Sequence, residues 1–472
     1  MKKFTKIVAT ISDRRCDVEF IRRLFENGMN VVRMNSAHLS REGFVNIVKN
    51  VRAVSQRIAI MMDTKGPEIR TTATVADEPI SFVSGQRVNI IGNPDLLTTA
   101  ECIYLNYSQI ASDVTVGQHF LIDDGELDFL ITAINNDGTI TAVSQNDGVL
   151  GSRKSVNIPG SNLSLPAISE RDRQNIAIAV ELGIDFIAHS FVRSRADVEA
   201  LHELIGHLGG RIQVISKIEN QQGVDNFDEI LDASYGIMIA RGDLGIEVAA
   251  ERIPGIQNKM IRKCIAAHKP VIVATQMLHS MINNPRPTRA EVSDIANAVY
   301  QRADALMLSG ETAKGRYPVE AIATMSRVAM EMERTLSEEP IEVPPLVDAH
   351  VTSFLARQAV VSERMIGTKA IVTDSNHGRT ARYIASFRGN NPVIAVCYNE
   401  TVSRCLNLSY GITAFYSPNK RLGHHYPTEE LRRFVALGLI KIEDRIAYLG
   451  ALNGTGATFL EINSVDAIIA NS

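Results

Sequence analysis

The sequence lacks several features that mark whole classes of protein. Its 472 residues include 49 Lys and Arg against 53 Asp and Glu, a net charge of −4, so there is no basic surplus. Proteins that bind nucleic acid generally need such a surplus, and we expect no nucleic-acid partner. No run approaches the roughly 18 apolar residues that a membrane span requires. Lys6 and Asp13 interrupt the apolar N-terminal run, so we expect no membrane partner and no signal peptide.

Cysteine is also scarce. The five cysteines form neither a CxxC pair nor a zinc spacing, and their odd number is typical of a reduced compartment, so we expect a cytoplasmic protein. The chain has no Gly-Lys dipeptide, which excludes the GxxxxGK[ST] phosphate loop. His202-Glu203 with His207 has the wrong spacing for a zinc protease helix and is expected to be a surface helix face.

What the chain does have is a series of short apolar runs closed by polar residues. Eight of them are rich in β-branched residues and do not alternate in polarity, as in strands buried on both faces of a parallel sheet. They lie at 7–11, 31–35, 58–63, 186–190, 214–217, 237–241, 271–275 and 305–309. Segments of helical periodicity separate them, so the pattern predicts an α/β fold built on a (β/α)8, or TIM, barrel.

One gap between these runs is too long for a β/α unit. The gap between the third and fourth runs far exceeds the roughly 30 residues of such a unit, and the surplus is the size of a domain. The inserted segment has short strands and many turns, which predict a small β-barrel lid at the barrel mouth. Beyond a charged, proline-rich connector, alternating strands and helices predict a doubly wound α/β domain. The predicted domains are a barrel (1–70 and 165–340), a lid (71–164) and a C-terminal domain (341–472).

Charged side chains gather at the ends of the eight runs, where barrel enzymes place their catalytic groups. A rim with both cations and carboxylates suggests an anionic substrate bound with a metal ion. Glu219 and Asp243 follow consecutive runs and suit Mg²⁺, because two carboxylates leave room for substrate oxygens and water. Arg33 and Lys217 can neutralise a phosphoryl group during transfer. Taken singly, each of these residues also fits a salt bridge or a solvated side chain, so the inference depends on the pairs.

Six stretches resemble the pyruvate kinase family. They are MDTKGPEIR (62–70), IQVISKIEN (212–220), ARGDLGIE (240–247), ATQML (274–278), PRPTRAE (285–291) and MLSGETAKG (307–315). The resemblance spans almost the whole chain and is weakest after the connector. It implies the same three-part architecture and the transfer of the phosphoryl group of phosphoenolpyruvate to ADP, giving pyruvate and ATP.

The resemblance implies a role for each residue at the rim. Mg²⁺ or Mn²⁺ would be held by Glu219 and Asp243. The transferring phosphoryl group would be stabilised by Lys217 and Arg33. The substrate carboxylate would lie against Thr275 and the backbone of Gly242 and Asp243.

Further roles concern the proton and the nucleotide. Thr275, Ser309 and Glu311 would lie near the water chain that protonates the enolate. The nucleotide phosphates would contact Arg70 and Lys154, and lid closure would bring Asp124 toward the nucleotide-bound metal.

K⁺ is the family's second cation. Three of its ligands match Asn35, Asp63 and the Thr64 carbonyl. The fourth is normally a serine hydroxyl where this chain has Ala37, so a water or a backbone carbonyl must substitute or the site is weaker. Glu68 argues for dependence on K⁺, because family members with Glu at this position generally require the ion. We therefore expect K⁺ activation with a raised K⁺ requirement.

Two other regions depart from the family or leave alternatives open. Ser12-Asp13 stands where the family usually has Gly-Pro, which changes a turn beside the nucleotide. Residues 375–380 and 453–458 occupy places where relatives bind a sugar phosphate, and ordinary turns explain them equally well. The resemblance also implies a homotetramer.

Two other functions fit the same rim. One is a metal-dependent barrel lyase or aldolase acting on phosphoenolpyruvate or a 2-oxo acid. The other is a catalytically idle, effector-binding homologue.

Overall fold

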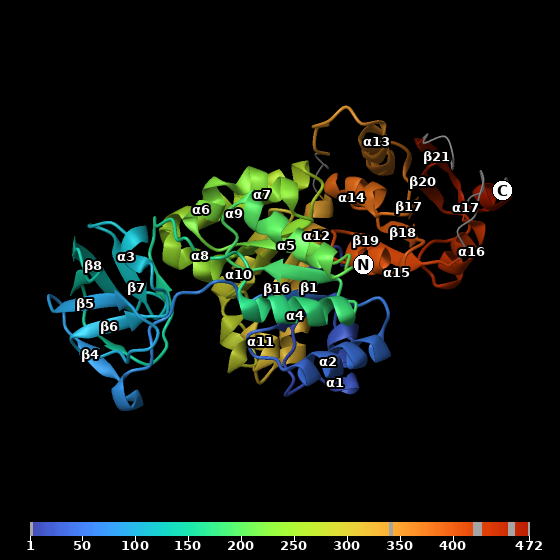
Figure 1. Cartoon of the computed structure of the whole chain (residues 1–472). Helices are drawn as coiled ribbons and strands as arrows, with labels where there is room; N and C mark the ends of the chain where they lie inside the picture. The colour runs from blue at the N-terminus through green and yellow to red at the C-terminus, as the bar shows by residue number, and fades with distance from the viewer. Residues whose placement is uncertain (1–2, 339–342, 419–426, 452–457, 471–472) are drawn as a thin grey trace.

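The structure is a computed structural model that describes residues 3–338, 343–418, 427–451 and 458–470. A barrel occupies the middle of the molecule, a β-rich insert stands at one end and an α/β unit at the other (Figure 1). No helix within these ranges is long and apolar enough to cross a membrane.

Eight parallel strands close into the central barrel in the order β1-β16-β15-β14-β13-β12-β3-β2. They are β1 (Lys6–Thr10), β2 (Val31–Asn35), β3 (Ala59–Asp63), β12 (Phe186–His189), β13 (Gln213–Ile218), β14 (Gly236–Ala240), β15 (Val271–Ala274) and β16 (Ala305–Leu308). Each strand coincides with one of the eight apolar runs, which confirms the predicted TIM barrel. The runs do not alternate because their outward side chains pack on helices and their inward side chains fill the barrel.

Helices surround the barrel, and several begin at a residue whose side chain accepts a hydrogen bond from the first turn, as Ser40 and Thr288 do. They are α1 (Val18–Glu26), α2 (Arg41–Val54), α4 (Glu170–Glu181), α5 (Arg195–His207), α6 (Gln221–Asp225), α7 (Phe227–Ala233), α8 (Arg241–Glu247), α9 (Ile253–Ala266), α10 (Arg289–Tyr300), α11 (Gly310–Ala313) and α12 (Pro318–Glu338). Short 3-10 turns lie at η2 (Ala250–Arg252) and η3 (His279–Ile282).

The insert between β3 and β12 is a curled six-stranded sheet with the order β11-β7-β8-β9-β5-β6, beside a ribbon of β10 and β4. Its elements are η1 (Val75–Asp77), β4 (Ile80–Phe82), β5 (Arg87–Gly92), β6 (Cys102–Leu105), α3 (Ile110–Asp113), β7 (His119–Ile122), β8 (Leu127–Ile134), β9 (Ile140–Ser144), β10 (Gly148–Leu150) and β11 (Val156–Asn157). The sheet has its own buried core, which includes Phe82, Phe120 and Phe129. Within the six-stranded sheet, β5 and β6 alone pair in parallel, because the chain returns along β5 before β6 begins. We call this insert the lid.

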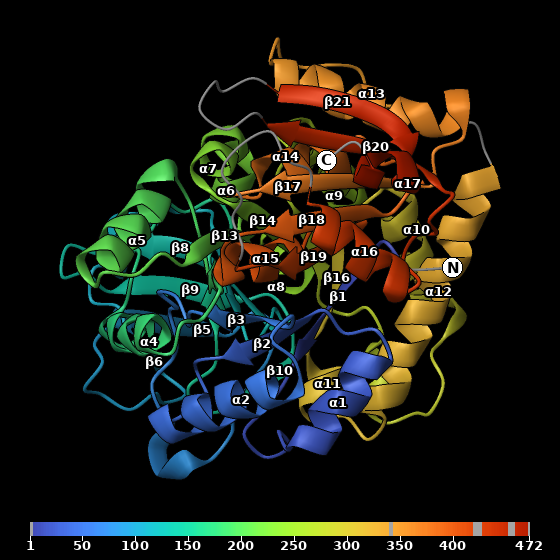
Figure 2. The same ribbon diagram turned by 90° about the vertical axis from the view of Figure 1, so that its right-hand side faces the viewer.

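The C-terminal unit is a five-stranded sheet with the order β19-β18-β17-β20-β21, in which β21 alone is antiparallel to its neighbour. Figure 2 shows helices on both faces of this sheet, as predicted for a doubly wound domain. Its elements are α13 (Val351–Ile366), β17 (Ala370–Ser375), α14 (Arg379–Ser386), β18 (Val393–Cys397), α15 (Glu400–Leu406), β19 (Ile412–Tyr416), α16 (Thr428–Ala436), β20 (Arg445–Ala451), β21 (Thr458–Ser464) and α17 (Val465–Ala470). The exact domain boundaries stay a prediction.

The C-terminal unit covers the amino end of the barrel. Cys405 and Leu408 belong to the same buried cluster as the inward-facing barrel residues, including Met61 and Phe186. The backbone N–H of Gly411 also donates to the Phe4 carbonyl. The carboxyl ends of the strands therefore form the open end of the barrel, beneath the lid.

Candidate active site

The ends of β2, β3 and β13 bring two cations and two carboxylates into contact. Arg33 Nη2 lies 2.5 Å from Asp63 Oδ2, and Lys217 Nζ lies 3.4 Å from the same oxygen. Lys217 Nζ also lies 2.7 Å from Glu219 Oε1. The two carboxylate side chains are at most 2% exposed and the two cationic side chains 11%. Charges so deeply buried are costly unless they are paired, and here they pair with one another.

Burial and pairing oppose each other in the pKa values of this cluster. Burial lowers the pKa of Lys217, but Glu219, Asp63 and Asp243 outweigh it and hold that pKa above its usual value. Burial raises the pKa of Asp63, but Arg33 and Lys217 outweigh it and hold that pKa below its usual value. Glu219 differs, because burial together with the Asp243 carboxylate raises its pKa to about 7 despite Lys217. The cluster is therefore short of positive charge at Glu219.

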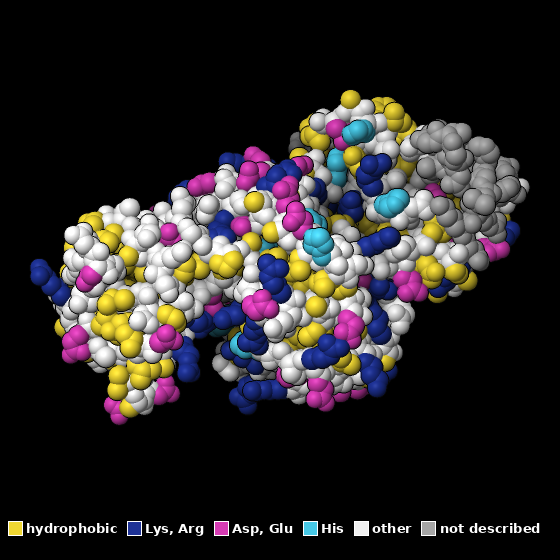
Figure 3. All heavy atoms as spheres, viewed as in Figure 1, with side chains coloured by type: hydrophobic (Ala, Val, Ile, Leu, Met, Phe, Trp, Pro, Cys, Tyr) yellow, Lys and Arg dark blue, Asp and Glu magenta, His cyan; other side chains and the backbone are white. Residues whose placement is uncertain are grey.

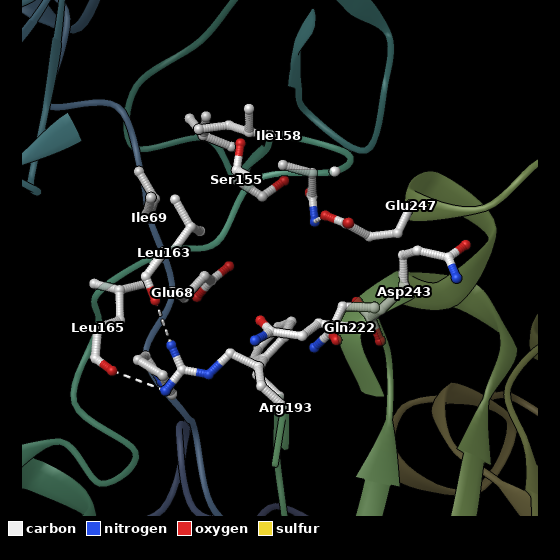
Figure 4. A pocket seen from close by; sticks show the side chains of 18 of the residues that line it. Glu68, Ile69, Ser155, Ile158, Leu163, Leu165, Arg193, Gln222, Asp243 and Glu247 are labelled. Atoms are coloured by element: carbon white, nitrogen blue, oxygen red, sulfur yellow. Dashed lines mark hydrogen bonds between the residues drawn. The ribbon is translucent and has the colours of Figure 1, made fainter. Parts of the chain in front are cut away.

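Asp243 lies on α8, at the wall of a cavity of about 510 Å³ between the lid and the barrel. Figure 4 shows Asp243 and Glu247 on one side of this cavity and Glu68 and Ile69 on the other. Among the described residues, the Asp243 carboxylate has no hydrogen-bond or ion-pair partner. A free carboxylate beside a carboxylate with a raised pKa fits a divalent cation.

The donor set for this cation is small. Within the described ranges, no group of three or more His, Cys, Asp or Glu side chains is placed to hold a metal ion. Two protein carboxylates suit Mg²⁺, because this ion commonly keeps its water ligands and binds substrate oxygens. His202 and His207 lie on α5, and the His202 ring instead contacts the Ala233 carbonyl through Nε2 at 3.1 Å.

A second group of oxygens lies beside Arg33. Asp63 Oδ1 is buried and has no hydrogen-bond partner in the part of the chain that the structure describes, and the Asn35 Oδ1 atom accepts a bond of 3.1 Å from the Ala37 N–H. Ser36, which precedes Ala37, has a buried hydroxyl that bonds to none of the described residues. An unsatisfied buried carboxylate oxygen next to an amide oxygen and the Thr64 carbonyl fits a monovalent cation.

Thr275 and Gly242 meet at the ends of β15 and β14. The Gly242 N–H donates to Thr275 Oγ1 at 2.8 Å, and Thr275 has a φ of 71°, which is rare for a β-branched residue. Arg241 holds this turn in place, because its Nη2 atom donates to the Thr275 carbonyl at 2.7 Å and its Nη1 atom to Asp294 at 2.7 Å. Arg241 is thus committed to Asp294 and to the Thr275 backbone.

Ser309 and Glu311 lie at the end of β16. The Glu311 side chain is buried and accepts bonds from the Ser309 N–H at 2.8 Å and the Leu278 N–H at 3.1 Å. These bonds join the ends of β15 and β16. Ser12, in the unusual N-terminal turn, donates from its hydroxyl to the Ala313 carbonyl just beyond them.

The predicted nucleotide contacts line the lid side of the cavity. Arg70 Nη2 lies 2.7 Å from Glu68 Oε1, and Lys154 Nζ lies 2.6 Å from Asp123 Oδ2. Asp124 accepts a bond of 3.0 Å from the Ser155 hydroxyl. The structure thus brings these residues to one cavity with Asp243, but in this arrangement each basic side chain is paired with an acid.

The region predicted for an effector is described only in part. The Gly378 N–H donates to Ser375 Oγ at 2.9 Å, and Gly378 has a φ of 75° just before α14. This is a local turn at a helix start. Residues 453–457 lie outside the described residues.

Sequence reasoning missed several residues around the site. Ser190 and Phe191 follow β12, whose end contributed no predicted site residue, and they bond to Lys217 and Glu219. Asp172 accepts bonds from the Lys65 and Gly66 N–H groups of the lid connection. The signal that could have pointed to Ser190 was that no site residue had been predicted at the end of β12, although barrel enzymes place catalytic groups at strand ends.

Comparisons with known proteins point to one family. The family model described as the barrel domain of pyruvate kinase matches residues 2–322, and that of the pyruvate kinase alpha/beta domain matches residues 354–458. A pyruvate kinase from Borreliella burgdorferi is 41% identical, with 99% of each chain covered. One from Geobacillus stearothermophilus is 40% identical over all of this chain and 82% of the relative.

A solved structure is similar as well. The crystal structure of a pyruvate kinase from Cryptosporidium parvum matches with a TM-score of 0.91 and 35% identity, covering 98% of this chain and 96% of that one. Sequence relatives, family models and fold all agree over nearly the full length. The chain therefore belongs to the pyruvate kinase family of phosphotransferases.

Proposed function

We propose that the chain transfers the phosphoryl group of phosphoenolpyruvate to ADP, giving pyruvate and ATP in glycolysis. The observation that carries this proposal is the buried cluster of Arg33, Lys217, Asp63 and Glu219 at the open end of the barrel. Phosphoryl transfer depends mainly on positioning and on neutralising charge, which two buried cations can supply.

The alternatives explain the structure less well. A lyase acting on phosphoenolpyruvate has no nucleotide to cover, whereas here a lid with two further basic residues faces the cavity. An idle homologue has no use for a buried charge cluster that is costly to keep.

Glu219 and Asp243 are the residues that would hold Mg²⁺ or Mn²⁺, which when bound neutralises charge on the phosphoryl and enolate oxygens. Lys217 and Arg33 stabilise the negative charge on the transferring group. Because these side chains are nearly excluded from water, their electrostatic effect is stronger than it would be at the surface.

The substrate carboxylate is held by Thr275 and the backbone of Gly242 and Asp243. In the structure the Gly242 N–H donates to Thr275 Oγ1, so the substrate competes for this donor. After transfer the enolate needs a proton, and Thr275, Ser309 and Glu311 lie along the water route that we propose delivers it.

Arg70 and Lys154 bind the nucleotide phosphates once they release Glu68 and Asp123. Lid closure brings Asp124 toward the nucleotide-bound metal. The same closure excludes water, which protects the phosphoryl group from hydrolysis.

Asn35, Asp63 and the Thr64 carbonyl would hold K⁺, with Ala37 leaving one ligand position without a side-chain oxygen. We further propose that the protein is a cytoplasmic homotetramer without nucleic-acid or membrane partners. Light scattering on the purified protein tests the tetramer, and a monomer or dimer at working concentration contradicts it.

One assay separates the three functions. Purified protein is mixed with Mg²⁺, K⁺, ADP and phosphoenolpyruvate, and pyruvate is measured with a coupled dehydrogenase. ADP-dependent pyruvate supports the kinase, pyruvate without ADP supports the lyase, and no turnover supports the idle homologue.

The variant Lys217→Met tests the assignment of the lysine. We expect it to abolish transfer and to keep the fold, as judged by circular dichroism. Lys263→Met, which changes an α9 lysine paired with Asp228, is the control and is expected to retain activity. If Lys217→Met keeps most of the activity, the role proposed for Lys217 is wrong.

A further inference from the structure

The end of β12 and the Ser190 that follows it hydrogen-bond Thr64 at its N–H, its hydroxyl and its carbonyl. The Thr64 N–H donates to the Ala188 carbonyl at 3.0 Å. The Ser190 N–H donates to Thr64 Oγ1 at 2.9 Å, and the Ser190 hydroxyl donates to the Thr64 carbonyl at 2.7 Å. The position of the Thr64 carbonyl is therefore set by Ser190.

The Ser190 hydroxyl also accepts a hydrogen bond from Lys217, the lysine proposed to stabilise the transferring phosphoryl group. Lys217 Nζ donates to Ser190 Oγ at 2.9 Å. A serine hydroxyl has one proton, and here it is given to Thr64, so its lone pairs remain for Lys217. Two hydrogen bonds thus connect these groups in one direction: the Lys217 ammonium donates to Ser190 Oγ, and the Ser190 hydroxyl donates to the Thr64 carbonyl.

Ser190 has little freedom to leave this position. Its side chain is buried, with the residue 2% exposed, and the next N–H, that of Phe191, donates to Glu219 Oε2 at 2.6 Å. Phe191 has a φ of 55°, an uncommon conformation that persists only where surrounding contacts enforce it. The segment 188–191 therefore touches the proposed K⁺ ligand, the catalytic lysine and the divalent-cation ligand together.

We propose that Ser190 is a positioning residue whose hydroxyl joins the Lys217 ammonium to the Thr64 carbonyl, so that the lysine and the K⁺-binding loop reach their working positions together. The inference rests on the proposed function, because it takes Lys217 to act on the transferring phosphoryl group. Without the hydroxyl, Glu219 and Asp63 are the partners that remain for Lys217 among the described residues. The ion pair of Lys217 with Glu219, 2.7 Å long in the structure, is then tighter and competes with the divalent cation for that carboxylate.

Steady-state kinetics with three variants test this proposal. Ser190→Ala is expected to lower kcat about tenfold, with the KM for phosphoenolpyruvate changed by less than about threefold, and to raise the K⁺ concentration for half-activation about threefold. Ser190→Thr restores a hydroxyl and is expected to recover most of kcat. The matched control is Ser216→Ala, since Ser216 is equally buried and next to Lys217 but its hydroxyl bonds to Ser234 at 2.6 Å.

A binding measurement avoids activity altogether. Mn²⁺ titrations of the substrate-free protein, followed by electron paramagnetic resonance, are expected to show about threefold weaker binding in Ser190→Ala, because Lys217 without its Ser190 bond pairs more tightly with Glu219 and competes with the ion. Ser216→Ala is expected to bind Mn²⁺ as the unchanged protein does.

The possible outcomes are distinct. Unchanged kcat, K⁺ response and Mn²⁺ affinity in Ser190→Ala overturn the proposal, as does an equal loss in Ser216→Ala. If Ser190→Ala does not fold, Ser190→Cys fills the same space with a weak hydrogen-bonding group, and full activity in that variant also overturns it. If the unchanged protein does not turn over phosphoenolpyruvate and ADP, the proposed function fails instead.

Discussion

At the scale of single residues, the K⁺ requirement depends on one missing hydroxyl. Ala37 follows Asn35, whose amide oxygen is fixed by the Ala37 N–H. We expect activity to be low in K⁺-free tetramethylammonium buffer and to need more K⁺ than a site with four protein ligands. The variant Ala37→Ser is expected to lower the K⁺ concentration for half-activation roughly fivefold, because one added oxygen ligand is worth ~1 kcal/mol.

The measurement is a K⁺ titration of the coupled assay at constant ionic strength. Ser36→Ala is the companion variant, since the Ser36 hydroxyl is buried beside the site and has no hydrogen-bond partner within the described ranges. If Ser36→Ala raises the K⁺ requirement and Ala37→Ser leaves it unchanged, Ser36 has taken over the missing ligand position. Equal activity in tetramethylammonium and K⁺ contradicts the site itself.

A second residue-scale prediction concerns His189, at the end of β12. Burial lowers the pKa of His189 to about 4, outweighing the pull of Asp197 and Asp172, whereas an unfolded histidine titrates near 6.5. The folded protein therefore keeps His189 neutral. The stability that depends on this neutral histidine is complete above about pH 6.5 and is lost as the pH falls toward 4. The loss amounts to at most about 1.4 kcal/mol per pH unit.

Calorimetric melting of the wild type and His189→Gln between pH 7.5 and 4.5 checks this prediction. The variant is expected to lose less melting temperature on acidification than the wild type, and His202→Gln, at an exposed position, is expected to follow the wild type. Parallel losses in the wild type and His189→Gln argue that His189 does not carry the acid sensitivity.

The sequence predicts individual charged residues better than their partners. Lys217, Glu219 and Asp243 are recognisable because their chemistry is specific and because they follow predicted strands. Ser190 is not, since a serine after a strand fits any loop and its role comes from Lys217 and Thr64, which lie far from it along the chain. Arg241 shows the reverse case, because it is a charged residue at the end of a predicted strand but its bonds go to Asp294 and the Thr275 carbonyl.

At the scale of elements, the lid connection depends on the absence of a side chain at Gly66. Gly66 has a φ of 75°, and a Cβ atom there would lie 2.8 Å from Phe191 Cδ2 and 3.0 Å from Ser190 Cβ. Gly66→Ala is expected to push the connection off the segment after β12, lowering kcat about tenfold and stability by roughly 2 kcal/mol.

Gly85→Ala is the matched control. Gly85 also has a positive φ, 84°, but no atom of the described residues lies within 4 Å of the added Cβ. This variant is expected to cost about 1 kcal/mol from backbone strain and to leave kcat unchanged. Kinetics and calorimetry on both variants test this prediction. Equal kcat values for the two variants would show that contact of the added Cβ with Ser190 and Phe191 does not affect catalysis.

The sequence predicted strands best where both faces of the strand are buried. All eight barrel strands are mainly apolar and do not alternate in polarity, because both of their faces are covered. In the C-terminal sheet the sequence did not indicate β19 or β21. The apolar run of β21 is interrupted by Glu461 and Asn463, since this edge strand is only half buried, and single-sided burial gives a weaker signal.

At the scale of the whole molecule, the barrel and the C-terminal unit are joined by buried ion pairs. Asp304, just before β16, accepts bonds from Arg388 Nη2 at 2.6 Å and from the Tyr410 N–H at 2.8 Å. Asp185, just before β12, likewise accepts from Arg404 Nε at 2.6 Å. Neither partnership was visible in the sequence, because each joins residues from different predicted domains.

Asp304→Ala is expected to lower the free energy of unfolding by about 3–5 kcal/mol, because it leaves the Arg388 guanidinium buried without its carboxylate. The surface variant Asp228→Ala, which breaks an exposed pair with Lys263, is expected to cost less than about 1 kcal/mol. Urea unfolding of both variants measures the difference. The double variant Asp304→Ala with Arg388→Met is expected to recover part of the loss, since no unpaired charge remains in the interface. A loss in Asp304→Ala no larger than that in Asp228→Ala contradicts the buried pair as the link between the two units.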